Sequence, residues 1–172
     1  MRRRLVILVL ALAAIAGGST AFAASLEGTK GPDHLAGTPA PDRINGRAGD
    51  DQLDGLGGAD QLRGGRGADQ LHGGPGRDRL YGGPGPDVLA GDAGNDALVG
   101  GPGTDALLGG AGSDRINAAA GPGDVVDGGD GRDTIRSLDG ARDKISCGTG
   151  RDRVYADAID GVARDCEVVT RG

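Results

Sequence analysis

One nine-residue pattern runs through most of this chain and constrains its fold more than any other feature. It occurs fourteen times between Gly28 and Tyr155, with Asp always in sixth place and an aliphatic residue always in eighth. Gly usually stands first and fourth, and single extra residues interrupt the count at Ala118 and Ser137. A unit this short cannot bury its own apolar side chain, so it must stack on copies of itself. The period therefore predicts a solenoid.

Two places in the repeat never vary, and they define two columns of residues. The sixth place holds Asp33, Asp42, Asp51, Asp60, Asp69, Asp78, Asp87, Asp96, Asp105, Asp114, Asp124, Asp133, Asp143 and Asp152. The eighth place holds Leu35, Ile44, Leu53, Leu62, Leu71, Leu80, Leu89, Leu98, Leu107, Ile116, Val126, Ile135, Ile145 and Val154. In a short strand around the eighth place, the aliphatic side chain points inward and its two neighbours point outward. The repeat thus predicts an all-β fold with an aliphatic interior.

The residues around each Asp have the chemistry of a calcium site. Calcium prefers six to eight hard oxygen ligands, which carboxylates and main-chain carbonyls supply. Gly lets carbonyls approach an ion closely and reaches backbone angles barred to other residues. Of the 25 acidic residues only two are Glu, and the shorter Asp suits tight loops. Because Gly-rich loops lose much backbone freedom on folding, we expect bound cations to hold them together.

Several units match a known calcium-binding repeat. Gly-Gly-Pro-Gly-Arg-Asp-Arg-Leu-Tyr (73–81) and Gly-Gly-Pro-Gly-Thr-Asp-Ala-Leu-Leu (100–108) resemble the RTX, or haemolysin-type, calcium-binding nonapeptide. The resemblance implies a right-handed parallel β-roll with two nonapeptides per turn, calcium ions between Gly-rich loops stacked on the same side, and an extracellular setting. Fourteen units then correspond to about seven turns and a rod roughly 34 Å long at about 4.8 Å per turn.

The resemblance places each ion between units that are two apart. The best-supported pairs join Asp69 with Asp87, Asp78 with Asp96, Asp87 with Asp105, and Asp96 with Asp114. The Gly residues expected to line these sites are Gly65, Gly67, Gly74, Gly76, Gly83, Gly85, Gly94, Gly101, Gly103, Gly110 and Gly112. Early loops depart from the family pattern because residues such as Thr29, Thr38 and Leu56 replace the second Gly. Weaker candidate ligands are Asp33, Asp42, Asp51, Asp60 and Asp133.

A different role for the Asp column stays open. Asp often caps turns by accepting hydrogen bonds from nearby backbone amides, and this alternative has most weight in the first three units. Neighbouring Arg residues such as Arg77 and Arg132 could also neutralise some of the carboxylates. Exposed ion pairs contribute little to stability, so we do not expect them to replace a metal ion.

The N-terminus has the layout of a secretory signal peptide. Three Arg residues precede an apolar run over 5–16, and small residues lead to Ala23. We therefore predict that 1–23 is a signal peptide, that cleavage follows Ala23, and that the mature protein is extracellular. The alternative is a membrane anchor, but a span needs about 20 apolar residues. The run is too short for that, so we expect no stable membrane insertion.

Both ends of the roll can be placed from the repeat. Leu26 is in phase with the eighth place, so we expect the roll to occupy 24–155 and to begin with a strand. The register is lost beyond it, and 156–172 is predicted to be a C-terminal cap. Cys147 and Cys166 are the only cysteines of an exported chain and are predicted to form a disulfide. Two free or intermolecular thiols are the alternative.

The remaining chemistry favours a binding module over an enzyme. A net charge of −6 repels phosphate backbones, so nucleic acid is not an expected partner. No nucleophile elbow, zinc-protease motif or phosphate loop is present, and His34 and His72 lack partners at metal-ligand spacing. We predict a non-enzymatic protein that binds several Ca²⁺ ions. Alternatives are an adhesive or matrix module that binds a cell-wall polymer or a secreted partner protein, or an accessory module of a separately encoded secreted enzyme.

Overall fold

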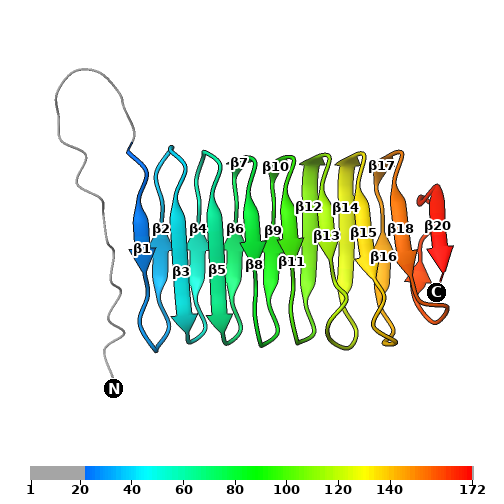
Figure 1. Cartoon of the computed structure of the whole chain (residues 1–172), viewed down its shortest axis with the longest axis horizontal. Coiled ribbons are helices and arrows are strands. Elements are labelled where there is room, and N and C mark those ends of the chain that lie inside the picture. Colours follow the sequence, from blue (N-terminus) through cyan, green and yellow to red (C-terminus); the bar gives the residue numbers. More distant parts are fainter. Residues whose placement is uncertain (1–21, 172) are drawn as a thin grey trace.

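Short strands follow one another along the chain and alternate between two parallel sheets (Figure 1). The computed structural model describes residues 22–171, so the predicted signal peptide lies almost wholly outside the described residues. All of the regular structure within 22–171 is β, and the predicted all-β class is confirmed. No helix in this part of the chain is long and apolar enough to cross a membrane.

Sheet A has nine strands. In spatial order they are β1 (Ser25–Glu27), β3 (Arg43–Ala48), β5 (Gln61–Arg66), β8 (Arg79–Tyr81), β11 (Ala97–Val99), β13 (Arg115–Asn117), β15 (Thr134–Ser137), β18 (Arg153–Ala156) and β20 (Val168–Arg171). Each strand pairs in parallel with the next in this order, as expected when equivalent segments of successive turns stack.

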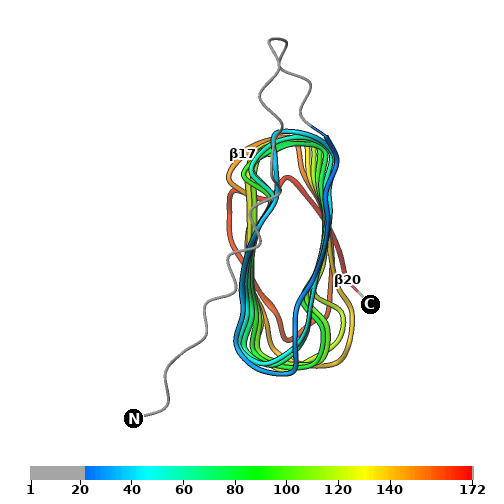
Figure 2. The same ribbon diagram turned by 90° about the vertical axis from the view of Figure 1, so that its left-hand side faces the viewer.

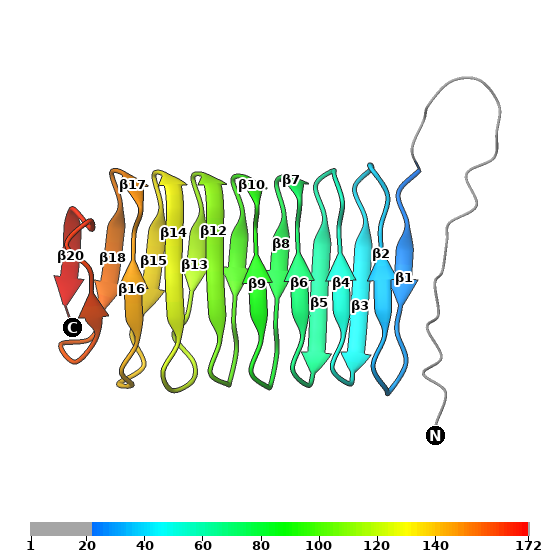
Figure 3. The same ribbon diagram turned by 180° about the vertical axis from the view of Figure 1, so that it is seen from behind.

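Sheet B lies on the opposite side of the roll, and Figure 3 shows the molecule from behind. Its main path consists of β2 (His34–Ala36), β4 (Gln52–Asp54), β6 (Gln70–His72), β9 (Val88–Ala90), β12 (Ala106–Gly112), β14 (Val125–Gly131), β16 (Lys144–Ser146) and β19 (Gly161–Val162). Three two-residue strands beside this path are β7 (Pro75–Gly76), β10 (Ala93–Gly94) and β17 (Thr149–Gly150). Viewed end-on, the two sheets form a flattened coil (Figure 2).

Strand pairing confirms two nonapeptides per turn. Leu62 is the Cα partner of both Ile44 and Leu80, each 18 residues away in the chain. The extra residues Ala118 and Ser137 are buried, and they lengthen the spacing without disturbing the columns. The eighth-place side chains are at most 2% exposed, so the predicted aliphatic interior is confirmed.

The roll has about eight turns, and the expected seven is therefore too low. At the N-terminus, Leu26 lies in β1 and pairs with Ile44, as its phase predicts. At the C-terminus, β19 and β20 extend both sheets although the nine-residue spacing is lost. Asp160 and Glu167 precede these strands and continue the two acidic columns.

The predicted disulfide is confirmed. Cys147 and Cys166 are bonded, with 5.2 Å between their Cα atoms. Cys147 is buried beside the aliphatic core, and Cys166 packs against that core. The bond therefore ties the last regular unit to the terminal turn.

Candidate metal centre

The sixth-place Asp residues line the two edges of the roll, where each loop enters a strand. One edge precedes sheet B and carries Asp33, Asp51, Asp69, Asp87, Asp105, Asp124 and Asp143. The other precedes sheet A and carries Asp42, Asp60, Asp78, Asp96, Asp114, Asp133 and Asp152. All are at most 7% exposed. Every pair of Asp residues proposed from the sequence thus occupies consecutive turns of one edge.

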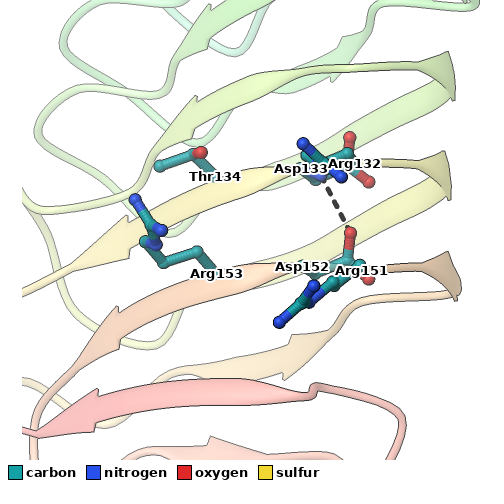
Figure 4. A pocket seen from close by; sticks show the side chains of 6 residues that line it. All are labelled: Arg132, Asp133, Thr134, Arg151, Asp152 and Arg153. Atoms are coloured by element: carbon teal, nitrogen blue, oxygen red, sulfur yellow. Dashed lines mark hydrogen bonds between the residues drawn. The ribbon is translucent and has the colours of Figure 1, made fainter.

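One oxygen of each carboxylate holds neighbouring turns together. The backbone N–H of Asp69 donates to Oδ1 of Asp87 at 2.9 Å, and the N–H of Asp87 donates to Oδ1 of Asp105 at 2.9 Å. The same bond joins Asp133 to Asp152 at 2.8 Å (Figure 4). The carboxylates do accept backbone amides, as the turn-capping alternative supposes, but the donor lies one turn away.

The second oxygen is buried and has no hydrogen-bond partner in most units. This is true of Oδ2 in Asp51, Asp60, Asp69, Asp78, Asp87, Asp96, Asp105, Asp114, Asp124, Asp133 and Asp152. Buried polar atoms in native proteins are almost always paired, because an unpaired one forfeits its hydration. Each of these oxygens therefore needs a proton or a cation.

The first two loops differ from the rest. Oδ2 of Asp33 accepts the Thr29 N–H, and Oδ2 of Asp42 accepts the Thr38 N–H. Most later loops have a left-handed residue in second place, including the non-Gly Leu56 with φ 72°, whereas Ala120 and Asp139 do not. In the first two loops, the amide of a second-place Thr without positive φ therefore occupies Oδ2.

This difference regroups the candidate ligands. Asp33 and Asp42 have amide partners on Oδ2, whereas the other weaker candidates, Asp51, Asp60 and Asp133, have the same unpaired oxygen as the central units. Asp124 and Asp152 share that oxygen and were not among the predicted ligands. Their invariant sixth place was the signal that could have identified them. Asp143 is different again, because its Oδ2 accepts the hydroxyl of the inserted Ser137.

Stacked loops bring carbonyl oxygens close to the carboxylates. A Cβ at Gly76 would overlap the Gly58 carbonyl oxygen, so the fourth place must be Gly there. A Cβ at Gly73 would lie 2.7 Å from Oδ2 of Asp78 and 2.9 Å from the carbonyl oxygen of Gly91. A carboxylate oxygen and a carbonyl oxygen therefore border the same small space, which only Gly leaves open.

The predicted Gly residues lie in these stacks. The second-place residues Gly65, Gly74, Gly83, Gly101 and Gly110 all have positive φ. At the fourth place, each Gly faces the carbonyl oxygen of the fourth-place residue one turn earlier. The Gly residues in this position are Gly67, Gly76, Gly85, Gly94, Gly103 and Gly112. All of the Gly residues proposed from the sequence therefore contribute to two lines of closely spaced loops.

Burial makes the charged form of these carboxylates unfavourable. Loss of hydration raises the pKa of Asp87 and Asp96 to about 7, although backbone hydrogen bonds oppose the rise. Desolvation likewise raises the pKa of Asp51 and Asp133 to about 6. Neighbouring carboxylates in the same column raise these pKa values further. A cation between turns would reverse this penalty, because it favours the ionised form.

The donor set fits a hard cation. Within residues 22–171, no three Asp, Glu, His or Cys side chains form a cluster that could hold a metal ion. A bound ion must therefore combine carboxylates with main-chain carbonyls, and such all-oxygen ligation suits calcium. The unpaired Oδ2 atoms and the spaces beside Gly73 and its equivalents fit this requirement.

Comparison with known families points to the same chemistry. The model of the RTX calcium-binding nonapeptide repeat matches the chain four times, over residues 27–62, 54–89, 90–122 and 123–152. No curated protein matches the chain significantly. The four matches span the strands and loops that carry both acidic columns. The chain therefore belongs to the RTX calcium-binding nonapeptide repeat family, and its β-roll is a calcium-binding repeat module.

Proposed function

We propose that this protein is exported, that calcium ions between its stacked loops complete its fold, and that it has no catalytic activity of its own. The observation that carries this proposal is the set of eleven buried Oδ2 atoms without a hydrogen-bond partner. They recur at a fixed place in consecutive turns, so their need for a counter-charge is a property of the whole roll. Bound calcium meets that need along both edges.

The proposed ligands follow from the two kinds of loop. The central carboxylates Asp69, Asp78, Asp87, Asp96, Asp105 and Asp114 hold ions together with neighbouring carbonyl oxygens. Asp51, Asp60, Asp124, Asp133 and Asp152 join them because they share the unpaired oxygen. Asp33 and Asp42 take no ion, because a local amide already donates to Oδ2 in each.

Two features support export. The first 23 residues have the layout of a cleaved leader. In addition, Cys147 and Cys166 form a disulfide, a bond that persists in oxidising compartments and is rare in the cytosol.

A non-catalytic role is supported by the uniformity of the acidic columns. Catalytic sites bring unlike groups together at one place, such as a nucleophile, a base and an oxyanion donor. Here the buried carboxylates make the same bond from turn to turn, for example Asp60 N–H to Asp78 Oδ1 at 2.7 Å and Asp78 N–H to Asp96 Oδ1 at 2.8 Å. That arrangement serves cohesion between turns.

The test uses the exported protein at pH 8. Circular dichroism in chelator should show a largely unfolded chain, and millimolar calcium should restore the β spectrum. Magnesium should be a poor substitute, because it requires tighter octahedral geometry. The proposal fails if the chelated protein keeps the same spectrum and melting temperature and titration calorimetry detects no calcium uptake.

A further inference from the structure

The outer face of sheet A is strongly basic although the chain is acidic overall. From β3 to β18 its outward seventh and ninth places carry Arg43, Arg63, Arg79, Arg115, Arg136 and Arg153, and no acid. All six Arg side chains are exposed. Within residues 22–171, the ion pairs found do not involve any of the six. This face therefore presents positive charge to solvent.

The side chains on this face repeat every four turns. The first Arg cluster, on β3, β5 and β8, consists of Arg43, Asn45, Gln61, Arg63, Arg79 and Tyr81. The second Arg cluster, on β13, β15 and β18, consists of Arg115, Asn117, Thr134, Arg136, Arg153 and Tyr155. Five of the six places are identical, and Gln61 is replaced by the also polar Thr134. Ala97 and Val99 of β11 separate the clusters.

The register sets the spacing of the charges. Arg43, Gln61 and Arg79 are successive Cα partners, so the two Arg residues lie two strands apart, about 9.6 Å at ~4.8 Å per strand. Equivalent residues of the two clusters lie four strands apart, or about 19 Å. Arg63 lies on the strand between Arg43 and Arg79, diagonal to both and roughly 7–8 Å from each. Each cluster is therefore a triangle of separated cations.

Each cluster also contains an aromatic ring beside an Arg. The guanidinium of Arg63 lies over the ring of Tyr81, 5.6 Å from its centroid. Arg136 and Tyr155 are likewise Cα partners on neighbouring strands. A cation–π contact restrains the guanidinium, so less freedom is lost when it binds a ligand. Figure 4 shows Thr134 and Arg153 of the second cluster close together and apart from Arg132 and Arg151.

We propose that the outer face of sheet A binds a linear carboxylated polysaccharide, with the two Arg clusters as equivalent subsites. Arg recognises carboxylates through paired hydrogen bonds, and the Asn, Gln and Thr side chains can bond sugar hydroxyls. The Tyr rings offer a flat apolar surface with a polar tip. This inference goes beyond calcium binding, since calcium folds the roll but does not touch the polymer.

The spacing of the Arg residues disfavours a nucleic acid. Charges lie about 3.4 Å apart along each strand of a duplex, so Arg residues roughly 7–10 Å apart would leave many phosphates unpaired. A polymer with a carboxylate on every second sugar matches sparse cations better.

The test uses the calcium-loaded exported protein with sodium hyaluronate, which carries one carboxylate per disaccharide, and neutral dextran as the control polymer. Calorimetry should detect binding to hyaluronate only. The double variant Arg79→Gln/Arg153→Gln should bind at least about tenfold more weakly, since each removes a charge-assisted contact. Each single variant should weaken binding less than the double variant, because one cluster remains intact.

The control variant Arg142→Gln/Lys144→Gln removes the same charge from the region of sheet B and should bind like the wild type. Calcium-induced folding of every variant is recorded in parallel. Equal binding of dextran and hyaluronate, unchanged affinity of the double variant, or equally tight binding of duplex DNA would each overturn the inference. A protein that folds on calcium but ignores hyaluronate refutes only this inference, whereas one that takes up no calcium refutes the proposed function.

Discussion

Replacing Asp87 by Asn should have opposite effects with and without calcium. Oδ1 of Asp87 accepts the Asp69 N–H at 2.9 Å, while Oδ2 has no hydrogen-bond partner. Asn keeps the acceptor and removes the buried charge. Without calcium the variant loses an unfavourable carboxylate and should be more stable than the wild type. With calcium it lacks a ligand and should be less stable.

The size of the effect follows from the pKa. Burial raises the pKa of Asp87 from 3.8 to about 7, and a shift of that size corresponds to up to about 4 kcal/mol above pH 7. Because the folded-state pKa is raised, the contribution of Asp87 to the stability of the metal-free protein is fully present below pH 3.8. This contribution is lost as the pH rises through about 7. Asp87 is 1% exposed, so solvent does not screen this cost.

The pH dependence of metal-free folding is the clearest readout. In chelator, the folded fraction of the wild type should rise as the pH falls from about 8 to 5, the reverse of ordinary acid denaturation. Asp87→Asn should shift the pH of half-folding upward, because one fewer proton is needed. The slope of its free energy of unfolding against pH should be smaller than that of the wild type by about 1.4 kcal/mol per pH unit.

Asp42→Asn is the matched control. Oδ1 of Asp42 accepts the Ala24 N–H and Oδ2 accepts the Thr38 N–H. The side-chain NH₂ group of an Asn would therefore face one of these two N–H donors and could not accept its hydrogen bond. This variant should be less stable by about 1–3 kcal/mol with or without calcium. If Asp87→Asn also loses stability in chelator at pH 8, or if the wild type unfolds as the pH falls toward 5, the assignment of Oδ2 as an unmet charge is wrong.

Two further predictions concern the loops and the terminal turn. Leu56 and Leu108 are both 43% exposed, but only Leu56 is left-handed, with φ 72°. Leu56→Gly should therefore raise the free energy of unfolding of the calcium-loaded protein by about 1 kcal/mol, whereas Leu108→Gly in β12 should lower it by about 1 kcal/mol. Equal denaturation midpoints would rule out strain at Leu56. Replacing Cys147 and Cys166 by Ser should cost about 3 kcal/mol, and an unchanged midpoint would show that the terminal turn holds without its bond.

The regular part of this fold could be predicted because residues at the same place in the repeat contact one another in successive turns. An aliphatic residue in every eighth place, such as Leu62 and Leu80, can be buried only by stacking on its equivalents, and that requirement sets both register and core. The terminal turn could not be predicted in this way, because Asp160 and Glu167 occupy the acidic columns after the nine-residue spacing has ended.

The sequence pattern also could not predict which Oδ2 atoms accept a backbone amide. Asp42 and Asp51 occupy the same place in the repeat, yet only Asp42 has an amide on Oδ2. The difference depends on the backbone angle of the second residue, which is left-handed even at the non-Gly Arg47 and Leu56. The family pattern has Gly at these two positions, so the sequence suggests a different loop. Stacking on the neighbouring loops nevertheless keeps the left-handed conformation.

The carboxylate bonds between turns give the roll a direction of assembly. For every sixth-place Asp, the backbone amide donates to a carboxylate of the next turn, as between Asp143 and Asp160 or Asp152 and Glu167. Each sixth-place amide therefore gains its carboxylate partner only after the following turn has been synthesised. At the end of the roll, the acceptors Asp160 and Glu167 lie in the terminal turn, which the disulfide between Cys147 and Cys166 ties to the last regular unit.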